Sequence, residues 1–108
     1  MRKPLLIIAL AAAVVLLVAA PAQATDEAAG ALFKTKCAMC HGADGAGKTP
    51  MGQKMGLKDL ASADVQKKTD ADLFSLTTRG KDKMPGYEGK LTKDQITDLV
   101  KFIRTLKK

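Results

Sequence analysis

The feature that most constrains this chain is the stretch CAMCH, from Cys37 to His41, which holds both of its cysteines and its only histidine. Three groups able to bind a metal or carry out thiol chemistry thus lie close together. Such a cluster serves a structural zinc site, thiol redox chemistry, a disulfide or the covalent attachment of haem. Each of these uses requires a different fold around it.

Zinc and thiol chemistry fit this cluster poorly. A structural zinc ion takes four Cys or His ligands, commonly as two separated pairs, and the chain has three such residues in all. A thioredoxin-like C-x-x-C follows a strand, but no strand pattern precedes Cys37. A disulfide between Cys37 and Cys40 would close too short a loop to add much stability. These interpretations remain as minor alternatives.

Covalent haem attachment accounts for all three residues. Two cysteines one helical turn apart can form thioethers with one edge of a porphyrin, and the next residue, His41, then places an imidazole nitrogen on the iron. Attachment also removes free thiols from an oxidising compartment. We predict one covalent haem c, held by Cys37 and Cys40, with His41 as an axial ligand of its iron.

The first 24 residues have the pattern of a secretory signal peptide. Arg2 and Lys3 precede an uncharged apolar run at 5–20, and small residues follow up to Ala24. The run is shorter than the roughly 20 residues needed to span a bilayer. We predict that 1–24 is cleaved and that 25–108 is one monohaem domain in the periplasm, or in the lumen of a thylakoid. Retention as a membrane anchor is the alternative.

The predicted domain is small and basic. It has 16 Lys or Arg against 11 Asp or Glu, a formal charge of +5, and four aromatic residues. A domain of this size buries little apolar surface by itself and usually needs a cofactor or another staple. Export and the lack of a continuous basic run disfavour nucleic acid. We expect a monomer that meets redox proteins through their acidic surfaces, without stable membrane insertion.

The sequence of this domain predicts an all-α fold, because no run of alternating apolar and polar residues indicates a strand. A short helix is expected after Ser62, and the strongest signal is the capping box of Thr92 and Gln95 before apolar residues at helical spacing. The glycines predict one loop over 41–56. Threonines able to cap a helix precede three predicted helices: Thr25, Thr69 and Thr92.

The sixth coordination position of the iron decides what the haem can do. The chain has no second histidine, so a methionine sulfur is the strongest candidate. Met84 lies in the loop KDKMPGYEG, 43 residues after His41, and Pro85 stiffens that loop. We predict Met84 as the second axial ligand. The other methionines after the leader, which we expect to point away or to pack on the ring, are Met39, Met51 and Met55.

These segments resemble a class I cytochrome c of the small exported bacterial or lumenal kind. The matching pieces are LFKTKCAMCHG, KMPGY and LVKFIRTL, which together span nearly all of 25–108. The resemblance implies a small cytochrome c fold of three to five helices wrapped around one covalently bound haem. It also implies that the first and last helices cross beside the haem, with Ala29 and Phe33 packed against Leu99 and Phe102.

The resemblance further implies a hydrogen bond that orients His41. In the family a proline carbonyl accepts the second ring N–H of the axial histidine, and Pro50 is the matching residue. Tyr87, three residues beyond Met84, is a candidate for a hydrogen bond near the ligand loop or to a haem propionate.

We predict a soluble electron carrier rather than an enzyme, because His41 and Met84 together leave no open iron position for a substrate. The alternatives are an open-site haem enzyme or gas-binding protein, if Met84 does not bind the iron, and a membrane-tethered cytochrome subunit of a redox complex, if the leader is retained. Six lysines are candidates for the docking face: Lys34, Lys36, Lys48, Lys54, Lys81 and Lys83.

Overall fold

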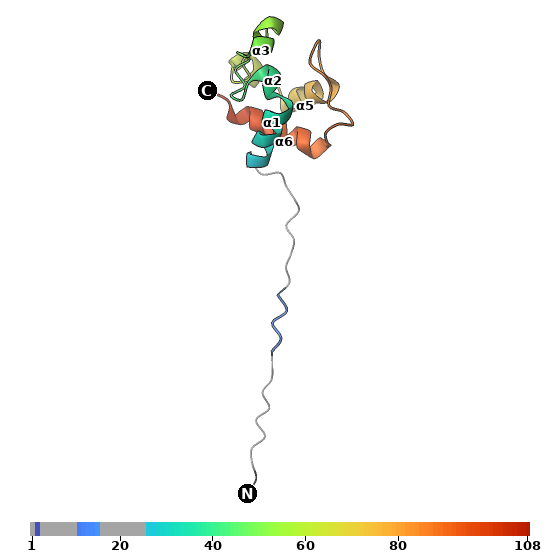
Figure 1. Ribbon diagram of the computed structural model, residues 1–108. Helices are drawn as coiled ribbons and strands as arrows, with labels where there is room; N and C mark the ends of the chain where they lie inside the picture. Colours follow the sequence, from blue (N-terminus) through green and yellow to red (C-terminus); the bar gives the residue numbers. More distant parts are fainter. Residues whose placement is uncertain (1, 3–10, 16–25) are drawn as a thin grey trace.

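The computed structural model describes Arg2, residues 11–15 and residues 26–108 (Figure 1). Most of the predicted leader, 1–24, therefore lies outside the described residues. Within the part that is described, no helix is both long enough and apolar enough to cross a membrane. The six helices of the described residues are α1 (Asp26–Lys36), α2 (Ala38–His41), α3 (Pro50–Met55), α4 (Ala63–Gln66), α5 (Asp70–Arg79) and α6 (Lys93–Thr105).

The all-α prediction is confirmed, and the capping signals account for where α5 and α6 begin. Thr25, the predicted cap of the first helix, lies outside the described residues. The hydroxyl of Thr69 accepts a hydrogen bond from the Asp72 N–H at the start of α5. The predicted capping box of α6 is complete, since Thr92 Oγ1 accepts from the Gln95 N–H at 3.1 Å and Gln95 Oε1 accepts from the Thr92 N–H at 2.9 Å. Such caps satisfy backbone donors that a helix leaves free at its N-terminus.

The prediction of one loop over 41–56 is wrong for its last part, where α3 forms. Thr49 caps this helix by accepting from the Gly52 N–H at 2.9 Å, Pro50 takes the first helical position, and Gly56 closes it with a left-handed φ of 63°. Proline favours the first turn of a helix because its missing N–H has no partner there anyway. This short helix brings the count to six, one more than expected.

The first and last helices cross, as predicted. Phe33 of α1 and Leu99 of α6 are both almost fully buried, and the rings of Phe33 and Phe102 lie 4.9 Å apart. Ala29 is also buried, and a Cβ added to the neighbouring Gly30 would meet the Phe102 ring at 3.4 Å. The close approach of the two helices thus depends on two small residues of α1, the predicted Ala29 and the glycine beside it.

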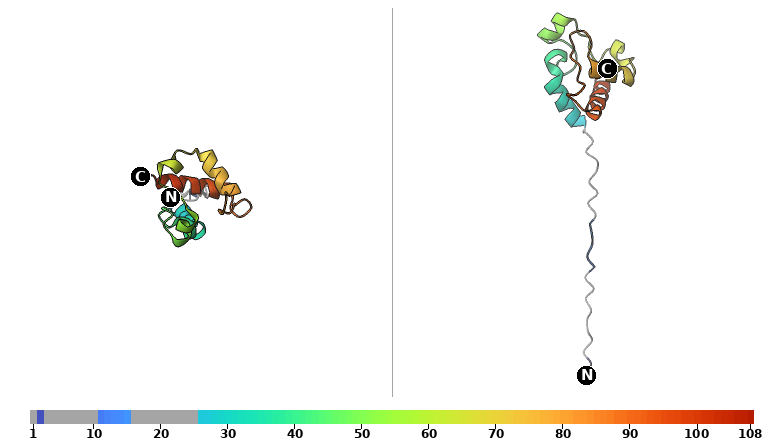
Figure 2. Two further views of the ribbon diagram at one scale, coloured as in Figure 1. Left: turned by 90° about the horizontal axis from the view of Figure 1, so that it is seen from above. Right: turned by 90° about the vertical axis from the view of Figure 1, so that its right-hand side faces the viewer.

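The two halves of the domain enclose a space between them. Both views of Figure 2 show α1, α2 and α3 on one side and α4, α5 and α6 on the other. A second apolar cluster, on the α4 to α6 side, joins Val65, Leu73 and Val100. The described residues contain eight buried apolar side chains in total. This is a small core for a domain of more than 80 residues.

Candidate functional site

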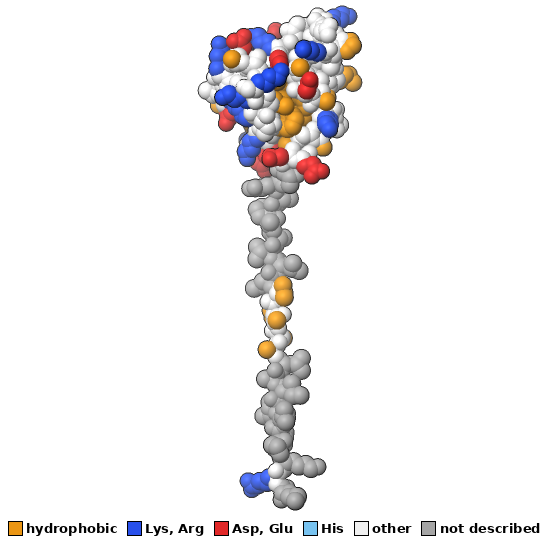
Figure 3. All heavy atoms as spheres, turned by 90° about the vertical axis from the view of Figure 1, so that its left-hand side faces the viewer, with side chains coloured by type: hydrophobic (Ala, Val, Ile, Leu, Met, Phe, Trp, Pro, Cys, Tyr) orange, Lys and Arg blue, Asp and Glu red, His pale blue; other side chains and the backbone are white. Residues whose placement is uncertain are grey.

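The space between the two halves is a cavity of about 520 Å³. This volume is in the range of sites that bind small molecules and cofactors. Its walls are mainly apolar, and in the view of Figure 3 hydrophobic side chains are visible in a recess of the surface with lysine or arginine side chains beside it. Every residue that the sequence marked as a haem ligand or attachment point lines it: Cys37, Cys40, His41 and Met84.

The two cysteines reach the cavity from one helical turn. The Cys37 N–H still donates to the Phe33 carbonyl at 2.8 Å, which continues the path of α1, and the His41 N–H donates to the Cys37 carbonyl at 3.0 Å. Cys37 and Cys40 therefore lie on the same wall of the cavity, and neither is in a disulfide. This is the arrangement that two thioether bonds to one edge of a porphyrin require.

Thiol redox chemistry finds no support in this environment. Burial, together with the neighbouring Cys40, raises the pKa of the Cys37 thiol to about 11. A reactive cysteine needs the opposite shift, because the thiolate is the nucleophile.

Across the residues that the structure describes, no three His, Cys, Asp or Glu side chains are grouped so that they could hold a metal ion by themselves.

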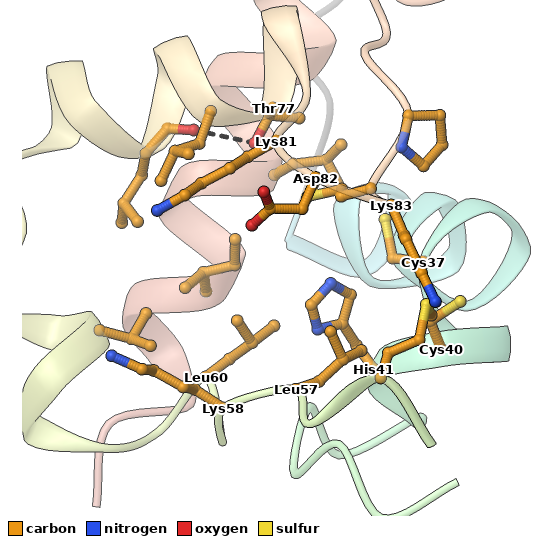
Figure 4. Close-up of a pocket in the computed structure, with 18 of the residues that line it drawn as sticks. Cys37, Cys40, His41, Leu57, Lys58, Leu60, Thr77, Lys81, Asp82 and Lys83 are labelled. Atoms are coloured by element: carbon orange, nitrogen blue, oxygen red, sulfur yellow. Dashed lines mark hydrogen bonds between the residues drawn. The ribbon is translucent and has the colours of Figure 1, made fainter. Parts of the chain in front are cut away.

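His41 is prepared to bind a metal that is part of a larger group. Figure 4 shows its ring pointing into the cavity. Burial lowers its pKa, so the imidazole is neutral at pH 7, which is the form that ligates metals. Its Nδ1 atom is buried and has no hydrogen-bond partner among the described residues. A haem in this cavity fits the two thiols and one nitrogen of the imidazole together, and the unpaired Nδ1 is then left for a hydrogen-bond acceptor.

The hydrogen bond predicted between His41 and the Pro50 carbonyl is not made in this structure, since Nδ1 of the His41 ring has no partner. Other contacts hold the chain after His41 close to the attachment turn. The Gly47 N–H donates to the His41 carbonyl at 2.8 Å, and the Thr49 hydroxyl donates to the Cys40 carbonyl at 2.6 Å. Gly52 is also tightly placed, because a Cβ added there would lie 2.5 Å from the Cys40 carbonyl oxygen.

Met84 reaches the same cavity from a tight loop after α5. Lys81 and Met84 exchange two backbone hydrogen bonds, of 3.1 and 2.9 Å, across a turn in which Asp82 has a left-handed φ of 52°. Met84 is half-buried and lines the cavity together with Pro85. In Figure 4 the Asp82 carboxylate also points into the cavity. The fold thus brings His41 and Met84 to one space although they are far apart in sequence.

The loop continues along the end of α5 and reaches α1. The N–H groups of Tyr87 and Glu88 donate to the carbonyls of Thr77 and Thr78, both at 3.0 Å. The Tyr87 hydroxyl donates to the carbonyl of Lys36, the last residue of α1, at 3.0 Å. The Tyr87 hydrogen bond thus runs from beside the ligand loop to the backbone in front of Cys37, an acceptor that the sequence did not suggest.

The other methionines differ in their exposure. Met55 lines the cavity, as expected of a residue that packs on the ring. Met51 does not line it and is 45% exposed, so its predicted packing role is not supported. Met39 is 81% exposed, which agrees with the expectation that it points away.

Lysines are concentrated among the residues that line the cavity. Four of the six predicted docking lysines are there, whereas Lys34 and Lys48 are not. Lys58 and Lys68 also line it and were missed, because nothing in their local sequence distinguishes them from other surface lysines. Asp82 is the one acidic residue in this lining. The lining lysines are Lys36, Lys54, Lys58, Lys68, Lys81 and Lys83.

Comparison with known proteins agrees with this site. A family model described as cytochrome c oxidase, cbb3-type, subunit III matches residues 24–103. The chain is 33% identical to cytochrome c6 of Nostoc sp. (strain PCC 7120) over 87 residues, which is 77% of this chain and 73% of that protein. It is 32% identical to cytochrome c6 of Thermosynechococcus vestitus, over 88% of this chain and 83% of that protein.

A solved structure gives the same answer at the level of the fold. The KustC0563 c-type cytochrome superposes with a TM-score of 0.69 at 30% identity, and the match covers 74% of this chain and 98% of that one. The cavity, the CAMCH turn and these relatives point to one conclusion. The chain belongs to the cytochrome c family, as a small helical c-type cytochrome that carries covalent haem c and transfers electrons.

Proposed function

We propose that this protein is a single-electron carrier, not an enzyme, whose haem iron is ligated by His41 and Met84. The observation that carries the proposal is that these two residues, 43 positions apart, line one cavity together with both cysteines. When bound, haem c supplies a one-electron iron couple, and a His/Met pair raises its reduction potential. If His41 and Met84 both bind the iron, no coordination position would be left for a substrate.

The chain's own residues have separate tasks in this proposal. Cys37 and Cys40 hold the group by two covalent bonds, and the neutral imidazole of His41 offers a lone pair inside the cavity. Two backbone hydrogen bonds between Lys81 and Met84 fix the turn that carries the Met84 side chain. Pro50 remains a proposed acceptor for the second ring nitrogen of His41, which has no partner among the described residues.

The lysines at the cavity favour partners with acidic docking surfaces. Six lysines and one aspartate line it, so its surroundings are strongly positive. Complementary charge speeds the encounter of two proteins and is screened by salt, which suits a carrier that must also leave its partner quickly. We propose such brief docking to acidic redox proteins by a monomer.

Export follows from the leader, and a second candidate function depends on it. We propose cleavage after Ala24, so that the mature carrier begins at Thr25 and is free in the periplasm or in a lumen. The matching family model is described as a subunit of a cbb3-type oxidase, and this favours a tethered subunit of a redox complex as the second candidate. The mass of the protein purified from its host distinguishes the two, because a tethered subunit keeps 1–24.

A spectrum of the oxidised holoprotein tests the proposed ligands. We expect the weak far-red band that arises from charge transfer between a thioether sulfur and ferric iron. Met84→Ala is expected to remove this band and to open the iron to cyanide, whereas Met55→Ala, which also truncates a methionine at the cavity, is expected to keep it. A wild-type spectrum without the band, or a band that survives Met84→Ala, contradicts the proposal and supports the open-site alternative.

A further inference from the structure

Tyr87 connects the segment that carries Met84 to the segment that carries the cysteines. It is the only tyrosine of the chain, and its hydroxyl donates to the Lys36 carbonyl at 3.0 Å across 51 residues of sequence. Lys36 ends α1 and directly precedes Cys37. Carbonyls in the last turn of a helix have no partner within that helix, so the phenol satisfies an acceptor that α1 leaves open.

The backbone of Tyr87 is also fixed by hydrogen bonds, to α5 and to the residues that follow it. Its N–H donates to the Thr77 carbonyl at 3.0 Å, and its own carbonyl accepts from the Leu91 N–H at 3.0 Å. The phenol therefore extends from a residue whose main chain is fixed to the end of α5. Any movement of the α5 end relative to α1 has to stretch or break this hydrogen bond.

The Met84 loop has few other connections to the attachment turn. Its backbone hydrogen bonds are internal, between Lys81 and Met84, or run to α5 through Tyr87 and Glu88. Among the hydrogen bonds found for the described residues, the Tyr87 phenol makes the one that joins this loop region to α1 or α2. The distance between the Met84 loop and the turn that carries His41 thus depends on packing and on this hydrogen bond.

We propose that Tyr87 is a positioning residue for Met84: its hydrogen bond to Lys36 holds the ligand loop against the attachment turn and limits how often the thioether leaves the iron. This inference rests on the proposed ligation by His41 and Met84. The phenol is partly exposed, so water can replace its partner when it moves away. The loss of one such hydrogen bond is expected to raise the population of the open loop roughly threefold to tenfold.

The test uses ferric holoprotein and cyanide, which binds the iron only while Met84 is away from it. Tyr87→Phe removes the hydroxyl but keeps the ring, which lies below the Lys90 ammonium group at 5.9 Å. We expect cyanide to bind Tyr87→Phe about threefold to tenfold faster than wild type, while the far-red band persists before cyanide is added. The unfolding midpoint of each variant is measured alongside.

A second variant separates positioning from general stability. Thr92→Ala removes the capping box of α6 at a residue that does not line the cavity, and it lowers the stability of the whole domain. We expect its cyanide rate to stay within about twofold of wild type. An unchanged rate in Tyr87→Phe, or equal acceleration in both variants, overturns the inference.

The failure of the proposed ligation would look different. In that case wild type has no far-red band, and Met84→Ala binds cyanide no faster than wild type, whatever Tyr87→Phe does. If the band is present and Met84→Ala binds cyanide much faster, the ligation is supported, and the Tyr87→Phe rate alone then decides on the positioning role.

Discussion

Gly80 lies directly against the backbone of Met84. A Cβ added to Gly80 would come within 2.5 Å of the Met84 carbonyl oxygen and 2.6 Å of the Gly86 nitrogen, and Gly80 itself has a left-handed φ of 75°. A side chain at this position is thus excluded both by backbone conformation and by space. The loop that carries the proposed ligand folds back onto the end of α5 only because residue 80 is a glycine.

Gly80→Ala is therefore expected to destabilise the holoprotein more than the same change at a glycine with open space around it. Gly89→Ala is the matched control, since Gly89 has a φ of 77° but nothing within 4 Å of an added Cβ. A positive φ costs a residue with a side chain about 1–3 kcal/mol, and the crowding at Gly80 adds about 1–3 kcal/mol. Denaturant unfolding measures both, and equal losses would contradict the close contact.

The core of α6 can be tested without touching the cavity. Ile96 is 2% exposed and does not line the cavity, so Ile96→Ala is expected to lower the free energy of unfolding by about 2–5 kcal/mol while the haem spectrum stays unchanged. Its neighbour Thr97 is exposed, and Thr97→Ala is expected to change stability by less than about 0.5 kcal/mol. Similar effects of the two substitutions would show that Ile96 is not a core residue.

The docking proposal predicts that a lysine at the cavity matters more than a lysine elsewhere. Lys83→Glu and Lys101→Glu change the net charge equally, but only Lys83 lines the cavity. In stopped-flow electron exchange with an acidic redox protein at low salt, we expect Lys83→Glu to slow association several-fold more than Lys101→Glu. The difference should shrink as salt rises, because screening acts on the charges of the interface. Equal slowing would mean that net charge alone matters.

Attachment of haem is expected to be a condition of folding. The cavity occupies the space between two halves of a domain with eight buried apolar side chains among its described residues, so the core is incomplete without an occupant. A Cys37→Ala/Cys40→Ala protein produced without covalent haem should show little helix by far-ultraviolet circular dichroism. A cooperative unfolding transition of that protein would refute this expectation.

The stability of the protein should depend on Tyr87 at alkaline pH. Burial, and the nearby Cys37 and Cys40, raise the pKa of the phenol above its ordinary value of 10.0. In the holoprotein the sulfurs are thioethers, so burial remains as the cause. Because the folded state holds the proton more tightly, the contribution to stability is complete below about pH 10 and is lost as pH rises through the folded pKa.

The measurement is the difference in unfolding free energy between wild type and Tyr87→Phe. Lysines titrate in both proteins and cancel in this difference. We expect it to be constant from about pH 7 to 9 and to decline above about pH 10. A difference that stays flat at alkaline pH would show that the phenol is not held in its protonated form by the fold.

Local signals in the sequence were sufficient for much of this structure. The starts of α5 and α6 follow from Thr69 and from the pair Thr92 and Gln95, because a cap involves residues three apart and forms within one turn. The cluster of Cys37, Cys40 and His41 is local for the same reason. Helix α3 was missed although Thr49 and Pro50 are a start signal, because the surrounding glycines suggested a continuous loop.

Tertiary structure alone decided which distant residues meet. Nothing in the sequence distinguished Lys58 and Lys68 from Lys34 and Lys48, yet only the first two line the cavity. The hydrogen bond from Tyr87 to Lys36 and the close contact of Gly80 with Met84 likewise depend on how α1, α5 and α6 pack. The sequence by itself thus determined the starts of α5 and α6, the haem-binding motif and Met84 as a candidate ligand, since these depend on residue type and short spacing. The shape of the cavity and the charges around it depend on packing between segments far apart in the chain, which no local pattern encodes.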